Sequence, residues 1–196
     1  SVPVIPEVVQ ANSNLEIDLG IDATNLKGYA YELEYDPRFM RLVDERAQEG
    51  DLLKRHPDKP MTLFISKSYD TESGTKRVLV ANMIVGPEHS VSGTGTLTTF
   101  RFVSVADGHT RFQLRNLVVM DGDFHLTALP DEWSRSVDIL EVPTHTELVQ
   151  NYPNPFNPET WIPYRLSKTS QVRVQIYNST GRLIRFLNLG VQNAGD

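Results

Sequence analysis

Apolar and polar residues alternate along much of the chain. Leucine or isoleucine occupies every second position of residues 15–21, and tyrosine or leucine every second position of residues 29–35. A period of two sends successive side chains to opposite faces of a strand, so each stretch predicts a half-buried strand. In the second stretch we expect the tyrosines and the leucine to point inward and the residues between them to point outward. Residues 25–28 predict a turn between the two strands.

Shorter strands are predicted further along the chain, each bounded by glycine, proline or small polar residues. Asp107-Gly108 predicts a hairpin between two of them. The charged segment 46–60 contains two prolines, and we expect a loop there with one helical turn at 51–54. Helical periodicity is absent, so the predicted fold class is all-β, an antiparallel sandwich. The shorter strands cover residues 39–43, 62–68, 77–85, 96–105, 111–119 and 137–142.

A proline-rich segment lies near the C-terminal end. Three prolines fall within six residues there, and each one fixes its own φ, lacks an amide donor and pushes the preceding residue toward an extended backbone. A linker is the simplest interpretation of this composition. The strand-like stretches that follow, at 161–166, 172–177 and 182–189, favour a folded domain instead. The segment consists of Asn151, Tyr152, Pro153, Asn154, Pro155, Phe156, Asn157 and Pro158.

From Leu148 to Gly195 the sequence resembles the start of the C-terminal sorting domain of many bacterial surface and secreted proteins, the type IX secretion class. The resemblance implies an immunoglobulin-like domain, related to one in flagellar hook-capping proteins, on an exported, surface-associated protein. A sandwich of this class needs about seven strands, so we expect residues 148–196 to be a truncated N-terminal part. Because a lone hairpin is marginal in water, we expect its strands to rest on the preceding domain or to pair with another chain.

Composition narrows the functional classes. A formal net charge of −6 argues against non-specific nucleic-acid binding, which needs a basic face. The sequence has no cysteine, which excludes disulfides, thiolate metal sites and thiol catalysis. No apolar run approaches the ~20 residues of a membrane-spanning helix. No signal peptide is visible, so we expect mature sequence if the protein is exported.

Residue patterns typical of catalysis are missing as well. The sequence has no nucleophile elbow and no phosphate-binding glycine loop. Asp121-Gly122-Asp123 predicts a plain turn, because the later ligands of a calcium loop are absent downstream. The histidines fall in predicted loops or at strand ends with no paired spacing, and we expect isolated surface side chains rather than metal ligands. We therefore expect no catalytic residue, no metal and no cofactor. The histidines are His56, His89, His109, His125 and His145.

Short residue patterns follow one another at Gly28–Pro37 with Phe39 and Leu42, at Gly50–Leu52, at Arg77–Ala81, at Gly93–Phe102, and at Gly108 with Thr110 and Leu114. With these patterns in this order, residues 1–142 resemble cohesin modules. The resemblance implies a nine-stranded antiparallel jelly-roll sandwich, related to carbohydrate-binding modules, that binds a dockerin-type protein partner without catalysis. Polysaccharide binding by exposed aromatic side chains, or a role as a spacer or adhesin segment, are the alternatives.

The same resemblance implies where a partner binds, because the strand at 29–35 corresponds to a strand of the dockerin-binding sheet of cohesins. We expect Leu63 and Ile65 to point inward, which would turn the residues next to them toward the partner. A solvated strand surface without function is the alternative. A short linker at 143–147 would separate this module from the C-terminal domain. The predicted partner-binding face consists of Ala30, Glu32, Glu34, Phe64 and Ser66.

Overall fold

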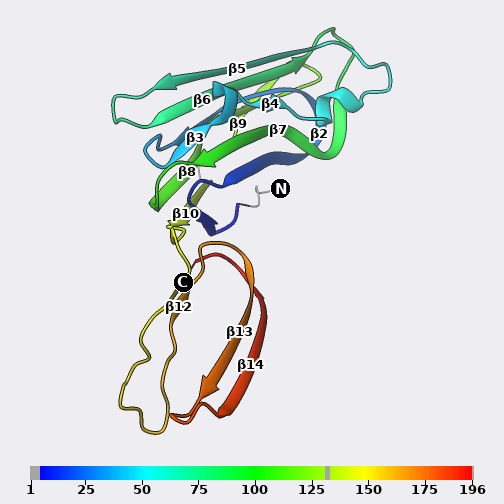
Figure 1. The fold of residues 1–196 in the computed structure, drawn as a ribbon. Helices are drawn as coiled ribbons and strands as arrows, with labels where there is room; N and C mark the ends of the chain where they lie inside the picture. Colours follow the sequence, from blue (N-terminus) through cyan, green and yellow to red (C-terminus); the bar gives the residue numbers. More distant parts are fainter. Residues whose placement is uncertain (1–4, 131–132, 196) are drawn as a thin grey trace. The chain divides into compact units, whose positions relative to one another are not determined.

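The computed structural model describes residues 5–130 and 133–195. The chain divides into two compact units, Ser1–Ile139 and Leu140–Asp196, here called unit 1 and unit 2. The predicted linker at 143–147 falls within unit 2. No helix among the described residues is long and apolar enough to cross a membrane. The predicted all-β fold class is confirmed, since residues 5–130 and 133–195 form strands and two short 3₁₀ turns (Figure 1).

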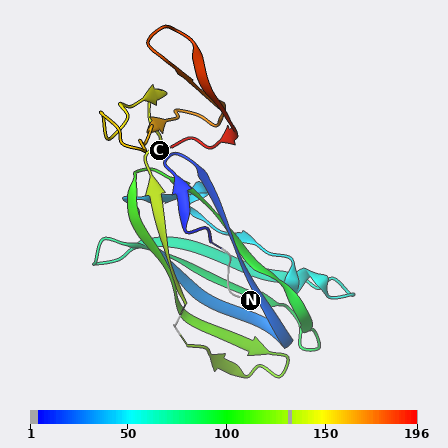
Figure 2. The same cartoon turned by 90° about the horizontal axis from the view of Figure 1, so that it is seen from below.

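Unit 1 is a β-sandwich (Figures 1 and 2). Two 3₁₀ turns, η1 (Val43–Glu45) and η2 (Leu52–Arg55), interrupt its strands. The second turn lies where the charged loop was predicted to contain a helical turn. The strands are β1 (Val8–Gln10), β2 (Asn14–Tyr35), β3 (Met40–Leu42), β4 (Gln48–Glu49), β5 (Thr62–Asp70), β6 (Lys76–Ile84), β7 (Val91–Ser104), β8 (Gly108–Asp121), β9 (Leu126–Ala128) and β10 (Ser134–Leu140).

The long strand β2 connects the two layers of the sandwich. Its N-terminal half pairs with β7, whereas its C-terminal half lies between β6 and β8. Beyond these neighbours, β5 pairs with β6, and β9 pairs with the C-terminal half of β8. We call this antiparallel arrangement, in the order β5-β6-β2-β8-β9, the β5 layer. In the other layer β3 and β4 pair with β7, and β1 neighbours β10, which pairs with the N-terminal half of β8.

Aromatic side chains fill the space between the layers. Tyr29, Tyr31 and Tyr35 on β2 are at most 4% exposed, so the predicted inward face of this strand is confirmed. Tyr31 lies 6.3 Å from Phe100 between ring centroids, and Tyr35 packs edge-on against Phe102 at 4.9 Å. Contacts of this kind add to the large apolar area that each ring removes from water.

The turn predicted at residues 25–28 is wrong, because β2 continues through it. The strand absorbs the irregularity as a bulge, with a register shift against β7 between Ala23 and Leu26. Asn25 has a φ of 57°, a left-handed conformation that asparagine tolerates better than most residues. Its backbone N–H donates to Ser92 Oγ, and its side chain accepts from Ser90. Turn-forming residues therefore bend this strand without reversing it.

The hairpin predicted at Asp107-Gly108 is also wrong. The chain does turn there, but β7 pairs with β2, β3 and β4, whereas β8 pairs with β2, β9 and β10. Gly108 has a φ of 135°, and a Cβ at this position would lie 2.6 Å from the Phe39 ring. Glycine is needed for that close approach and backbone conformation.

Unit 2 has few strands and little interior. Its longest pairing is the hairpin of β13 and β14, whose Asn178–Gly181 connection is closed by a hydrogen bond from Asn178 N–H to the Arg182 carbonyl. Among the described residues of unit 2, only Leu166 is a buried hydrophobic residue. The expectation that these strands rest on the preceding domain or pair with another chain stays a prediction. The strands are β11 (Glu147–Leu148), β12 (Tyr164–Arg165), β13 (Ser170–Tyr177) and β14 (Leu183–Gln192).

Candidate functional site

An apolar strip crosses the outer face of the β5 layer. Its members are adjacent in two cross-strand rows, because alternate residues of neighbouring strands share one face of a sheet. Three of them are strongly exposed: Leu63 at 53%, Ile65 at 48% and Leu126 at 70%. The apolar strip consists of Ile65, Ala81, Ala30 and Val118 in one row and Leu63, Met83, Gly28, Met120 and Leu126 in the other.

The apolar strip encloses a shallow groove of about 250 Å³. Its lining is almost entirely apolar and includes the side chains of Met83 and Met120. Methionine is unbranched and polarisable, so it adapts to the shape of a ligand. A contiguous exposed apolar surface rimmed by polar groups is typical of a protein interaction site.

A charged cluster borders the apolar strip on the same face. Glu34 Oε2 accepts hydrogen bonds from Arg77 Nε at 2.9 Å and from Arg115 Nε at 3.0 Å. Arg77 Nη1 also reaches Glu32 Oε2 at 3.3 Å, and Tyr69 donates its hydroxyl proton to Glu32 Oε1 at 2.5 Å. The two glutamates thus stand between two arginines, and each side chain is fixed by several partners.

Electrostatics keeps Glu34 ionised. Partial burial acts to raise the pKa of this carboxyl, but hydrogen bonds from Thr75 and Arg77 and the charges of Arg77 and Arg115 outweigh burial, and the pKa lies below its ordinary value. The pKa of Tyr69 is raised, first because its hydroxyl is hydrogen-bonded to Glu32. The cluster consequently presents a fixed pattern of charge and no free base or nucleophile.

Two of the five residues predicted for the binding face point the other way. Phe64 packs against the hydrophobic core, and Ser66 Oγ accepts the backbone N–H of Ala47 at 2.8 Å. Leu63 and Ile65, which were expected inside, occupy the outer face instead. Residues 63–65 are all apolar, so alternation alone does not decide which side of β5 is buried. The register of β5 against β6 decides which side of β5 is buried.

The other three predicted residues do lie together. Ala30 belongs to the apolar strip, and Glu32 and Glu34 belong to the charged cluster. Sequence reasoning missed the cationic half of the cluster, although Arg77 follows the turn at 71–75 and lies opposite Glu34 in the β2–β6 register. The available signal was the opposite charge of Glu34 and Arg77, which lie on two predicted strands.

The proline-rich motif forms an exposed loop in unit 2. Asn151 Nδ2 donates to Thr160 Oγ1 at 2.9 Å, and the backbones of Tyr152 and Trp161 exchange hydrogen bonds of 3.0 and 2.8 Å across the base of the loop. Tyr152 and Phe156 are 74% and 61% exposed. The remaining motif residues lie within the loop that these contacts close, and are Pro153, Asn154, Pro155, Asn157 and Pro158.

Asp121 and several histidines are further candidate metal ligands. The Asp121 carboxylate accepts the backbone N–H groups of Asp123 and His125, both at 2.9 Å, and one ligand atom from each of these three residues lies within 4.8 Å of the other two. The expectation that all histidines are isolated is wrong, because the rings of His56 and His89 lie with centroids 4.9 Å apart. Their loops are far apart in sequence, which hid the pairing.

Comparison with known proteins supports the fold. No family model and no curated protein matches the sequence. Solved structures do match. A cohesin module of a family 33 glycoside hydrolase from Clostridium perfringens is 22% identical, with 71% of this chain and 94% of that chain covered and a TM-score of 0.50. A type II cohesin domain from the cellulosome of Acetivibrio cellulolyticus is 11% identical, with coverages of 69% and 92% and a TM-score of 0.55.

A type II cohesin-X-dockerin complex from Acetivibrio cellulolyticus also matches, at 13% identity, with 71% of this chain and 93% of that chain covered and a TM-score of 0.54. At these identities the similarity concerns the fold. The chain therefore contains a cohesin-like β-sandwich.

Proposed function

We propose that unit 1 is a non-catalytic protein-binding module that recognises a dockerin-type partner. The observation that carries the proposal is the apolar strip beside the charged cluster on one face of a cohesin-like sandwich. The similar Acetivibrio structure is a cohesin-X-dockerin complex, which supports a protein as the partner class.

The two parts of the face suit different tasks in binding. Burial of Leu63, Ile65 and Leu126 would supply the hydrophobic contribution, at about 25 cal/mol for each Å² removed from water. Glu34 and Arg77 are already held in place, so a complementary charge on the partner meets little cost of ordering. Specific interfaces bury about 800 Å² per partner, which requires more of the β5 layer than the groove itself.

The experiment is a binding titration by calorimetry against a panel of dockerin modules, with calcium and with chelator. Ile65→Asp places a carboxylate in the middle of the apolar strip, and we expect it to weaken binding at least tenfold. Val8→Asp is the matched control, because Val8 is similarly exposed, at 52%, but lies on β1 outside the β5 layer. Equal affinity for the two variants would remove the proposed face.

Polysaccharide binding is the competing outcome of the same titration. A glycan platform needs exposed flat aromatic side chains. Of the aromatic residues described in the β5 layer, Tyr69 donates its hydroxyl to Glu32, and Tyr29 is 4% exposed. Binding of a glycan that Ile65→Asp leaves intact would contradict the protein-partner proposal.

We further propose that unit 2 is part of a sorting domain and that the protein is exported and associated with the bacterial surface. The support is the residue motif from Asn151 to Pro158 and the strands that follow it. The test is localisation of a reporter joined to unit 2 in a bacterium with a type IX secretion system. A reporter that stays inside the cell would contradict this proposal.

A further inference from the structure

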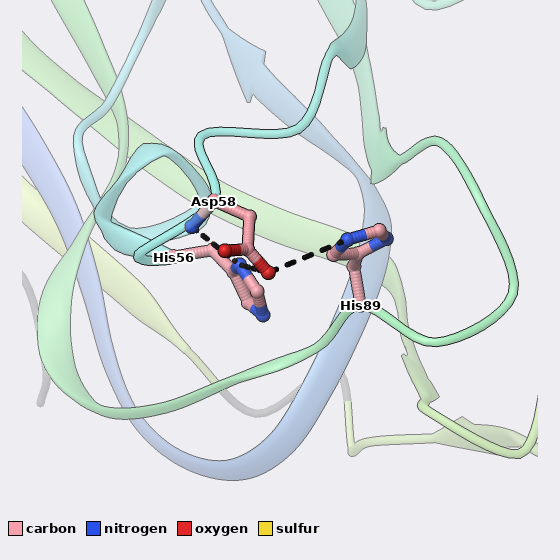
Figure 3. A group of neighbouring side chains, drawn as sticks. All are labelled: His56, Asp58 and His89. Atoms are coloured by element: carbon pink, nitrogen blue, oxygen red, sulfur yellow. Dashed lines mark hydrogen bonds and ion pairs between the residues drawn. The ribbon is translucent and has the colours of Figure 1, made fainter.

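Two loops of unit 1 bring three metal-ligating side chains together (Figure 3). His56 directly follows η2, Asp58 comes two residues later, and His89 lies in the connection between β6 and β7. Asp58 Oδ2 lies 3.9 Å from His56 Nδ1 and 3.9 Å from His89 Nε2. The ligand atoms of the three residues all lie within 4.8 Å of one another.

The Asp58 carboxylate lies close to both imidazoles without a hydrogen bond to either ring. Both 3.9 Å separations are too long for a hydrogen bond. His89 Nδ1 is buried, and no hydrogen bond from the described part of the chain to this atom fixes the tautomer of the ring. His56 Nδ1 accepts a hydrogen bond of 3.2 Å from the Asp58 backbone N–H, and a metal ion bound to this atom would replace that bond. The imidazoles are partly shielded, with side chains 17% and 30% exposed.

The protein holds the two loops in fixed positions. The buried Lys27 side chain donates from Nζ to the carbonyls of Gly86 and His89, the latter at 2.9 Å. Gly86 has a φ of 106°, and a Cβ there would lie 3.1 Å from His89 Nδ1. The Val85 backbone N–H donates to the Met61 carbonyl at 2.8 Å, which ties the bases of the two loops together. The surroundings thus prearrange the trio, in addition to the ring contact between His56 and His89.

We propose that His56, Asp58 and His89 bind a first-row transition metal ion such as Zn²⁺. Bonds of about 2.0–2.2 Å to nitrogen and oxygen place tetrahedral ligands roughly 3.3–3.5 Å apart. A closure of about half an ångström therefore suffices for the two pairs that include Asp58. Two imidazoles and one carboxylate favour Zn²⁺, Ni²⁺ or Cu²⁺ over Ca²⁺ and Mg²⁺. The Asp58 side chain is 74% exposed, so water can fill a fourth position.

The experiment uses the whole chain, stripped of metal with a chelator that is then removed. Zn²⁺ is titrated calorimetrically and in competition with a chromophoric chelator. We expect one ion per chain and a rise in melting temperature on loading, because an ion that binds only the folded state stabilises it. His56→Ala and His89→Ala should each lower the affinity at least tenfold. Ca²⁺ should not compete.

The controls are histidines outside the trio. His145→Ala removes an imidazole that is 74% exposed, and His125→Ala removes one that contacts Asp121. Both variants should bind Zn²⁺ like the unaltered chain. His89→Gln keeps the size of the side chain, and its melting temperature without metal shows whether the loop still folds. The proposal is overturned if the chain binds no Zn²⁺ at concentrations up to about 100 µM, a rough limit for a prearranged site. A site that survives His89→Gln but is lost in His125→Ala overturns it as well.

Discussion

Units 1 and 2 contain strands with the same alternation and bury them to different extents. On β6 in unit 1, Val78 and Val80 are fully buried. On β13 in unit 2, Val174 and Ile176 occupy the equivalent alternate positions and are only half-buried. The difference is that a second layer covers the inner face of β6. Alternation therefore specifies which side of a strand is apolar, and a facing layer is needed to convert it into a core.

The largest effect is expected in the core of unit 1. Tyr31→Ala should lower the free energy of unfolding by about 3–5 kcal/mol, because a fully buried ring between Tyr29 and Phe100 leaves a cavity. Urea denaturation followed by fluorescence measures it. Tyr31→Phe is the matched control, because it keeps the buried ring and removes only a hydroxyl that forms no hydrogen bond of standard geometry with the described residues. Its removal should change stability by less than about 1 kcal/mol. Equal losses for both variants would show that the ring does not carry the packing.

A smaller effect is expected from the charged cluster on the outer face. Glu34→Gln should cost about 1–2 kcal/mol at neutral pH, since Arg77 and Arg115 lose a charged acceptor. The pKa of Glu34 is lowered in the folded chain. The ionised carboxylate therefore stabilises the fold fully at pH values above the ordinary glutamate pKa of about 4.3. That stabilisation is lost as pH falls through the folded pKa.

The variant should therefore lose less stability on acidification than the unaltered chain, as measured by denaturation between neutral and acidic pH. Glu49 and Asp51 also have lowered pKa values, so the dependence should weaken without vanishing. An identical acid profile for Glu34→Gln would contradict the role of this carboxylate.

The smallest effect is expected in unit 2. Ile176→Ala should lower the free energy of unfolding by less than about 1 kcal/mol, because the side chain is already half-exposed and leaves little cavity.

Hydrogen exchange provides the direct comparison of the units. Amides of β13 should exchange faster than those of β6, since local opening is easiest where few apolar contacts must be broken. Slow exchange on β13 in the isolated chain would mean that another surface covers it.

Much of the fold could be predicted from local pattern. The inward tyrosines of β2, the short strand β3 and the turn at η2 all follow from period-two alternation or from turn residues. Partner choice could not be predicted in this way. Asn25 and Gly108 both signal a change of direction. Because β2 pairs with distant strands on both sides of Asn25, this residue forms a bulge instead of a turn. Because β7 and β8 pair with different strands, the chain turns at Gly108 without forming a hairpin.

The sequence by itself determined that this protein is built of strands and which side of β2 enters the core, because side-chain direction alternates within a single strand. Only the tertiary structure decided that Leu63 and Ile65 face outward and Phe64 inward, because consecutive apolar residues fit either face until β6 sets the register. It also decided that His56 and His89 meet. Their loops are joined by contacts between residues distant in sequence, and no local spacing encodes such contacts.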